Sequence, residues 1–170
     1  KSSACFPCAI SIGSSWNLTL INSLGKELAA EAEIKGVDVL LGPTINIHRH
    51  PLGGRHFECF SEDPFLTGKI AIEYVRGVQS KNIAACLKHF VGNDTEYERY
   101  TVSSNIDEKT LRELYLLPFE MAIKEANAKV VMSAYNKLNN IYCSSHKNLL
   151  IDVLKEEWSF EGYVVSDWGA

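Results

Sequence analysis

The sequence has little of what marks a membrane-bound or nucleic-acid-binding protein. Its longest apolar stretches, such as residues 37–41 with Asp38 inside, are far shorter than the roughly 20 residues that a membrane-spanning helix needs. It has 17 basic and 21 acidic residues, a net charge of -4 and no basic run. We therefore expect neither a membrane nor a nucleic acid as a partner, and we expect a small, neutral substrate.

The sequence also lacks a disulfide framework and a targeting segment. Its five cysteines are an odd number at irregular spacing, which leaves the cellular compartment open. Cys5 and Cys8 form a Cys-x-x-Cys pair, but Pro7 lies within it and no thioredoxin-like helix pattern follows. The chain opens on Lys1 and ends on Ala170 without a leader or a terminating signal. We interpret it as an internal fragment with structural thiols.

A closed metal-binding pattern is also missing. His48, His50, His56 and Cys59 lie close together, and imidazole and thiolate are zinc ligands. Their spacing fits no closed tetrahedral site. We therefore expect no metal here, and histidines that hydrogen-bond within their own loop.

What the sequence does contain is an alternation of short apolar runs and helical patterns. Gly36 is typical of a helix end, Asp63-Pro64 of a helix start, and Asp107 of a cap on a helix that Pro118 must kink or split. Strands are expected at 6–12, 37–41, 83–87, 130–134 and 162–165, with a helix between each pair. Single helices between apolar strands predict a parallel sheet.

Two architectures have such a sheet, and the first turn distinguishes them. A doubly wound nucleotide-binding sheet has a Gly-rich turn after its first strand, whereas Gly13-Ser14-Ser15-Trp16 matches neither phosphate-binding fingerprint. This favours a barrel and argues against a nucleotide cofactor. An eight-unit barrel takes about 250 residues. The fold class is therefore α/β, a partial (β/α)8 TIM-type barrel of about five parallel strands with four helices.

Polar side chains follow the expected strands, at the end where barrel enzymes carry their sites. They are Asn46 and Arg55, Lys88-His89, Tyr135-Asn136 and Ser166-Asp167. The adjoining loops, 42–61 and 91–105, are longer than most connections in compact domains, and both contain arginine. The sequence thus predicts one functional rim that collects these residues.

The residues on this rim stand in motifs that together resemble the N-terminal barrel domain of glycoside hydrolase family 3, the β-glucosidase and β-xylosidase group. The resemblance covers nearly the whole chain and implies that residues 1–170 are part of that domain in a larger glycoside hydrolase. It rests on Leu41-Gly42-Pro43, Asn46-Ile47-His48-Arg49, Pro51-Leu52-Gly53-Gly54-Arg55-His56-Phe57-Glu58, Ser61-Glu62-Asp63-Pro64, Lys88-His89-Phe90, Met132-Ser133-Ala134-Tyr135-Asn136 and Ser166-Asp167-Trp168.

The resemblance implies a retaining β-glucosidase-like exo-hydrolase that removes non-reducing terminal β-D-glucosyl residues through a covalent glycosyl-aspartate, without a cofactor. Asp167 is similar to the family's catalytic nucleophile. The segment after Lys88-His89-Phe90 is Val91-Gly92-Asn93, not the Pro-Gly-His of the N-acetylglucosaminidase branch, which favours the glucosidase-like branch. The residues that resemble the lining of the sugar subsite are Arg55, Lys88, His89, Arg99 and Tyr135, with Met132 beside them.

A retaining glycosidase needs a second carboxyl group as its acid, and none in this chain has a clear claim to that role. In the resembled family this residue lies in a later domain. Glu58 is expected to pair with Arg55, and Glu96 and Glu98 with Arg99. We therefore leave the acid unassigned and expect the missing barrel segment and a second domain of the same parent chain as partners of this one.

Three alternatives remain open. The first is a β-xylosidase-type specificity, which stays open because glucose and xylose differ by only one hydroxymethyl group. The second is an inactive sugar-binding fragment that lacks its acid. The third, more remote, is a Schiff-base aldolase in which Lys88 attacks a carbonyl.

Overall fold

A parallel sheet forms the centre of the computed structural model, which describes residues 2–170; Lys1 lies outside the described residues. The strand order is β1-β2-β4-β7, so the strands of this sheet follow one another in space in the same order as in the chain. This order has no reversal of the kind that creates the switch point of a doubly wound sheet. The strands are β1 (Val39–Leu40), β2 (Ala84–Phe90), β4 (Val130–Ser133) and β7 (Tyr163–Ser166).

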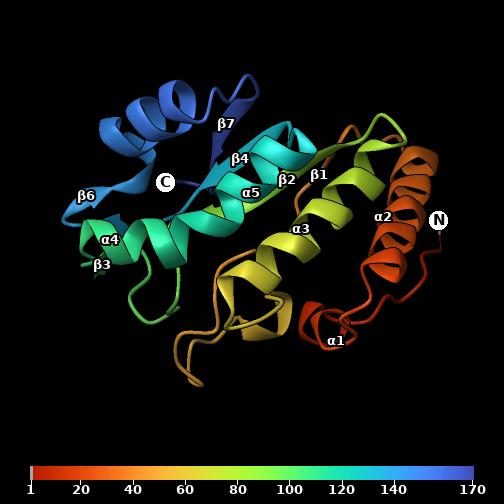
Figure 1. The fold of residues 1–170 in the computed structure, drawn as a ribbon, viewed down its shortest axis with the longest axis horizontal. Helices are drawn as coiled ribbons and strands as arrows, with labels where there is room; N and C mark the ends of the chain where they lie inside the picture. The colour runs from red at the N-terminus through yellow and green to blue at the C-terminus, as the bar shows by residue number, and fades with distance from the viewer. Residues whose placement is uncertain (1) are drawn as a thin grey trace.

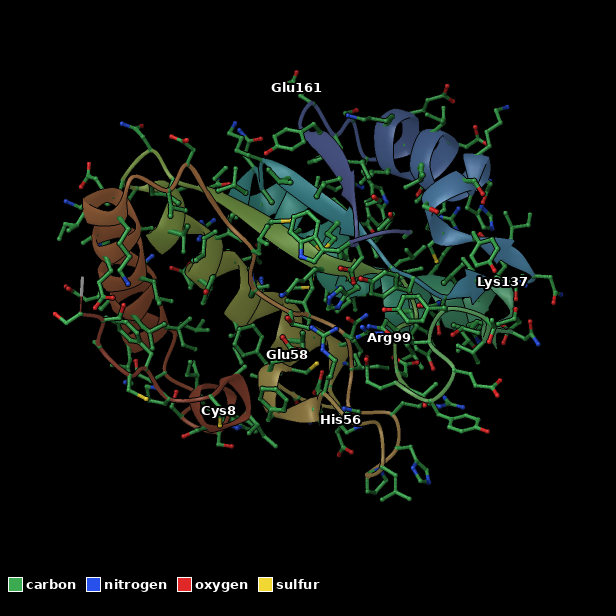
Figure 2. The ribbon with its side chains drawn as sticks, turned by 180° about the vertical axis from the view of Figure 1, so that it is seen from behind. Cys8, His56, Glu58, Arg99, Lys137 and Glu161 are labelled. Atoms are coloured by element: carbon green, nitrogen blue, oxygen red, sulfur yellow. The ribbon has the colours of Figure 1, made fainter. Side chains whose placement is uncertain are left out.

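Helices from the crossover connections cover one face of this sheet (Figure 1). The view from behind shows the strands in front of these helices (Figure 2). Helix α2 packs against α3, and α3 packs against α5. The helical segments are α1 (Ala9–Gly13), α2 (Leu18–Lys35), α3 (Pro64–Gln79), α4 (Glu108–Thr110), η2 (Leu111–Leu116), α5 (Leu117–Ala126), η4 (Asn148–Glu157) and the short turns η1 (His56–Glu58) and η3 (Cys143–Ser145).

A second, three-stranded sheet lies at the loop end of the main sheet, in the order β3-β5-β6. It joins the loop after β2 to the hairpin after β4, because β3 pairs with β5 in parallel and β5 with β6 in antiparallel. Its strands are β3 (Ser103–Ser104), β5 (Lys137–Leu138) and β6 (Ile141–Tyr142). The pairing fixes the ends of two loops that border the functional rim.

The predicted helix ends are confirmed. The Asp63 carboxylate accepts hydrogen bonds from the backbone N–H groups of Phe65 and Leu66 at the start of α3. Gly36 ends α2 with a left-handed φ of 73°, a conformation that favours glycine. Asp107 caps the third helical region, which has π-helical turns over Leu111–Leu116 before the α5 segment that Pro118 opens. The chain stays helical through Pro118, and the turns change from π-helical to α-helical at Leu117, so the predicted kink or split stays a prediction.

The close packing of α2 on α3 depends on two glycines. A Cβ on Gly25 would lie 2.7 Å from the Tyr74 carbonyl oxygen, and a Cβ on Gly77 would lie 2.4 Å from the Asn22 carbonyl oxygen. Both distances are inside van der Waals contact with backbone atoms. Any larger residue at either position would push the two helices apart.

The two faces of the sheet have different surroundings. Leu87, Phe90 and Val131 face the large core under the helices, where the Phe90 ring lies 5.0 Å from that of Phe119. Alternate residues on the opposite face form a small cluster of Cys86, Val130 and Met132. Side chains alternate along a strand, so this smaller face leads directly to the functional rim. Among residues 2–170, no helix is long and apolar enough to cross a bilayer.

One expected strand is wrong, and the described parallel sheet accordingly has four strands where about five were predicted. Residues 6–8 lead into helix α1 (Ala9–Gly13), and residues 9–12 are part of that helix. Ala9 and Ile12, three positions apart, pack against the core, whereas Ile10 is exposed. A run this short has the same apolar content in a strand or a helix, so periodicity alone could not distinguish them. The second strand is also shorter than expected, Val39–Leu40 rather than 37–41.

Candidate active site

The carboxyl ends of the strands form the wall of one cavity of about 200 Å³. Every residue proposed from the sequence for the sugar site lines it. The lining residues are Leu41, Arg55, Lys88, His89, Arg99, Met132, Tyr135, Asp167 and Trp168. The side chains proposed for the sugar site therefore meet at one cavity, whereas Asn46, Asn136 and Ser166, also expected at the rim, do not line it.

Asp167 follows β7 and is held by its backbone and by one of its two carboxylate oxygens. Its N–H donates to the Ser133 carbonyl oxygen at 3.2 Å, and Oδ1 accepts a hydrogen bond from the Trp168 N–H at 2.8 Å. Oδ2 is buried and accepts no hydrogen bond from any residue in the described range 2–170. The carboxylate is thus oriented through one oxygen and retains a free lone pair on the other.

His89 lies next to that free oxygen, with its Nε2 3.5 Å from Asp167 Oδ2. Burial, and to a lesser extent the nearby cations Arg55, Lys88 and Arg99, lower the pKa of His89 from 6.5 to about 3. The imidazole is therefore neutral around pH 7, so its contact with Asp167 is not an ion pair.

The backbone of His89 is fixed by a side chain from the neighbouring segment. The Asn46 amide donates to the His89 carbonyl oxygen at 2.9 Å, and Asn46 Oδ1 accepts from the His89 N–H at 2.8 Å. The peptide bond between Lys88 and His89 is cis. A buried asparagine that satisfies both backbone groups of one residue holds this strand end in a single position.

Lys88 and Arg55 share one carboxylate. Glu58 contacts Arg55 Nε with Oε1, and its Oε2 lies 3.9 Å from Lys88 Nζ. The Thr44 hydroxyl donates to the same Oε2 at 3.1 Å. The predicted Arg55–Glu58 pair is confirmed, and the additional link to Lys88 connects the loop after β1 to the end of β2.

Arg99 is held by a carboxylate and two aromatic rings. Its Nη1 lies 2.9 Å from Glu96 Oε2, and its guanidinium carbon lies 5.0 Å from the Tyr100 ring centre and 4.8 Å from that of Tyr135. Such stacking suits the flat guanidinium. The expected Arg99–Glu96 pair is confirmed. The expected pair with Glu98 is wrong, since Glu98 makes no ion pair with any described residue; its backbone has a φ of 49°, within the turn that redirects the loop.

Tyr135 is oriented by a hydrogen bond to the backbone of Trp168. Its hydroxyl donates to the Trp168 carbonyl oxygen at 2.7 Å. Burial and then the nearby Asp167 carboxylate raise the pKa of Tyr135, so the phenol stays protonated near neutral pH. Met132 is buried beside Cys86 and lines the cavity. Trp168 is 65% exposed, which leaves its ring available at the mouth of the cavity.

The histidine and cysteine cluster comes together in the loop after β1. Potential ligand atoms of His48, His56 and Cys59 lie within 4.8 Å of one another, without His50. His48 Nε2 is 3.0 Å from two carbonyl oxygens, those of His56 and Cys59, and therefore donates. Burial raises the pKa of the Cys59 thiol to about 12. These contacts support the predicted role of the cluster in hydrogen bonding within the loop.

A larger cavity, about 410 Å³, lies away from Asp167. Arg49, Asp94 and Tyr115 line it, together with residues at the start of α4. Burial raises the pKa of Asp94 to about 6, although Arg49 opposes this effect. None of the residues that follow or end β2, β4 and β7 at the Asp167 cavity lines this larger one, so its size does not make it the better candidate for the site.

This chain belongs to glycosyl hydrolase family 3. The family description "Glycosyl hydrolase family 3 N terminal domain" matches residues 1–170.

The chain is similar to several β-glucosidases. It is 57% identical to "Beta-glucosidase" of Rhizobium radiobacter over 166 residues, 98% of this chain and 20% of that protein. It is 51% identical to "Thermostable beta-glucosidase B" of Acetivibrio thermocellus over the same length, which is 22% of that protein. The chain thus spans about a fifth of the length of these relatives.

Solved structures agree with the fold. β-Glucosidase 3B from Thermotoga neapolitana, in complex with α-D-glucose, superimposes with a TM-score of 0.95 at 51% identity, over 96% of this chain and 23% of that one. The β-glucosidase from Kluyveromyces marxianus, in complex with glucose, gives a TM-score of 0.98 at 47% identity, over 99% and 20%. The parallel sheet is therefore part of a TIM-type barrel, and the predicted fold class is confirmed.

Sequence reasoning missed two members of the cavity lining as site residues, Leu41 and Trp168. Both directly adjoin predicted features, since Leu41 follows β1 and Trp168 follows Asp167. It also missed Asn46 as the residue that holds the His89 backbone. The signal for all three was their position at the carboxyl end of a strand, which applies to apolar residues as well as to charged ones.

Proposed function

We propose that the protein containing this chain is a retaining β-glucosidase-like exo-hydrolase, in which residues 1–170 are part of the N-terminal barrel domain. The observation that carries the proposal is the Asp167 carboxylate, buried at the cavity wall with Oδ2 free of hydrogen bonds from the described residues. In this mechanism Oδ2 attacks the anomeric carbon of a terminal β-D-glucosyl residue as the glycosidic bond breaks. Water then releases the sugar from the glycosyl-aspartate.

The cavity lining supports the binding of a polyhydroxylated ring. Lys88, Arg55 and Arg99 supply donors to sugar oxygens, and the neutral His89 imidazole offers both a donor and an acceptor. Trp168 presents an exposed ring at the cavity mouth, where the apolar face of a sugar can stack. The names of the relatives and the glucose-bound structures favour glucose over xylose as the sugar.

The Schiff-base aldolase is the less favoured reading. A lysine nucleophile must be a neutral amine, whereas Lys88 Nζ faces the Glu58 carboxylate at 3.9 Å. This contact suits Lys88 better to binding a sugar hydroxyl than to attacking a carbonyl. No carboxylate among the cavity-lining residues other than Asp167 is available as the acid, so we place the acid in the remainder of the parent chain.

The test is hydrolysis of 4-nitrophenyl β-D-glucoside by the full-length protein, beside its Asp167→Asn variant and the 170-residue chain alone. We expect the parent to turn over, with the β-D-xyloside as the poorer substrate. We expect the variant to lose at least about 10³-fold in kcat, since asparagine cannot form the ester. Parental rates from Asp167→Asn would refute the proposal. Equal turnover by the short chain would refute the placement of the acid elsewhere.

A further inference from the structure

Glu58 lies between two cations of the sugar site without lining the cavity itself. Its Oε1 contacts Arg55, and its Oε2 lies 3.9 Å from Lys88 Nζ and 3.1 Å from the Thr44 hydroxyl. With Lys88 and Thr44 it lines a separate, neighbouring cavity of about 230 Å³. Figure 2 shows Glu58 near the middle of the molecule, on the loop side of the sheet. A sugar in the site would therefore meet Arg55 and Lys88, but not Glu58.

The Glu58 carboxylate lowers the electrostatic repulsion between Arg55 and Lys88 and restricts both side chains. Arg55 and Lys88 point into one small cavity, where two unscreened positive charges repel each other. Both side chains are also long and flexible, and each loses rotamer entropy when it is held in one position. An anion between them removes the repulsion and restricts both side chains before the sugar arrives, so less entropy is lost on binding.

Glu58 itself is well fixed. It sits in the turn η1, three residues after Arg55, and its side chain is only 22% exposed. The Thr44 hydroxyl orients Oε2, and Thr44 forms a parallel bridge with Lys88. Ile45 N–H also donates to the Lys88 carbonyl oxygen at 2.8 Å. The Thr44 hydroxyl therefore links the Glu58 carboxylate to the segment that pairs with Lys88.

The charges continue in alternation beyond Arg55. Arg55 Nη1 lies 3.9 Å from Glu96 Oε1, and Glu96 Oε2 lies 2.9 Å from Arg99 Nη1. The Glu96 N–H donates to the Gly53 carbonyl oxygen at 3.2 Å, which joins the two long loops. The order Lys88, Glu58, Arg55, Glu96, Arg99 is therefore a chain of alternating sign, in which Glu58 links the strand to the loops.

We propose that Glu58 is a positioning residue for sugar binding, which acts through Lys88 and Arg55 and makes no contact with the sugar. This inference rests on the proposed glycosidase function. It predicts that loss of the charge weakens binding of the sugar more than it slows the chemical step at Asp167. It also predicts that the effect of Glu58 depends on the presence of Lys88.

The test uses the full-length protein with Glu58→Gln, and with Glu62→Gln as the matched control. Glutamine keeps the size of the side chain and the acceptor for Thr44, and Glu62 is an exposed glutamate in the same segment. With 4-nitrophenyl β-D-glucoside, we expect Glu58→Gln to raise KM and the inhibition constant of glucose about tenfold and to change kcat less. Glu62→Gln should match the parent in all three. Glu58→Gln introduced into a Lys88→Met background should raise the glucose inhibition constant by less than threefold over that of Lys88→Met alone.

The outcomes separate the two proposals. A parent without β-glucosidase activity overturns the proposed function and this inference with it. An active parent whose KM and glucose inhibition are unchanged by Glu58→Gln overturns this inference alone, and so does an equal effect with and without Lys88. If Glu58→Gln does not fold, Thr44→Val removes only the hydroxyl that orients Oε2. We then expect a two- to threefold rise in KM, and an unchanged KM overturns the inference.

Discussion

The protonation state of His89 gives a prediction whose size follows from the structure. Burial and three nearby cations lower the pKa of His89 from 6.5 to about 3. An unfolded chain binds a proton at this residue below pH 6.5, whereas the folded chain stays neutral until about pH 3. The difference in His89 pKa therefore has no effect on the free energy of unfolding at pH 8, and it lowers that free energy progressively as the pH falls below 6.5.

The magnitude follows from linkage. Each pH unit below 6.5 adds up to about 1.4 kcal/mol in favour of the unfolded state, so that His89 alone costs about 2 kcal/mol at pH 5. Replacing His89 with glutamine removes the titrating group. We expect the loss of stability of the full-length protein between pH 8 and pH 5 to be smaller in His89→Gln than in the parent by about this amount.

Histidine labelled with ¹³C at Cε1 gives the direct measurement. The His89 signal, assigned by its absence from His89→Gln, should keep the chemical shift of a neutral ring from pH 8 down to pH 5. A His89 signal that titrates with a midpoint near 6.5 would refute the neutral, buried imidazole and the account of its contact with Asp167.

Two further predictions concern stability. Burial raises the pKa of Asp94 to about 6, so ionisation of this carboxyl group destabilises the folded protein above that pH and has no effect below pH 4. Asp94→Asn should therefore raise the free energy of unfolding by about 1–3 kcal/mol at pH 8 and hardly change it at pH 4. Equal gains at both pH values would contradict this prediction. Gly77→Ala should destabilise the protein by about 1–3 kcal/mol, because its Cβ meets the Asn22 carbonyl oxygen at 2.4 Å. Gly68→Ala, on the same helix, should cost less because its Cβ meets the flexible Met121 side chain; thermal unfolding of both variants checks the order.

Features that depend on local chemistry could be predicted from the sequence. The Asp63 cap, the Gly36 helix end and the Asp107 cap each depend on residues within a few positions of one another. The convergence of Lys88 and Asp167 could also be predicted, because parallel strands bring their carboxyl ends to one edge. Helix α1 could not, because a short apolar run fits a strand equally well.

The links that hold the site residues in place were harder to predict. Arg55 and Glu58 are three residues apart, so their pairing follows from one turn of chain. The contact of Glu58 with Lys88 depends instead on the bridge between Thr44 and Lys88, and hence on the register of two segments far apart in the sequence. Glu96 and Glu98 were both candidate partners of Arg99. The ion pair forms with Glu96, and Glu98 lies in a turn with a φ of 49° that the sequence did not reveal.

We propose that Asp167 forms the covalent bond to the sugar. The most direct measurement is incubation of the full-length protein with 2,4-dinitrophenyl 2-deoxy-2-fluoro-β-D-glucoside, followed by mass spectrometry of the intact protein and its peptides. We predict one added fluoroglucosyl group, carried by the peptide that contains Asp167, and none in Asp167→Asn. A label on another carboxylate, or inactivation with no label at all, would contradict the account.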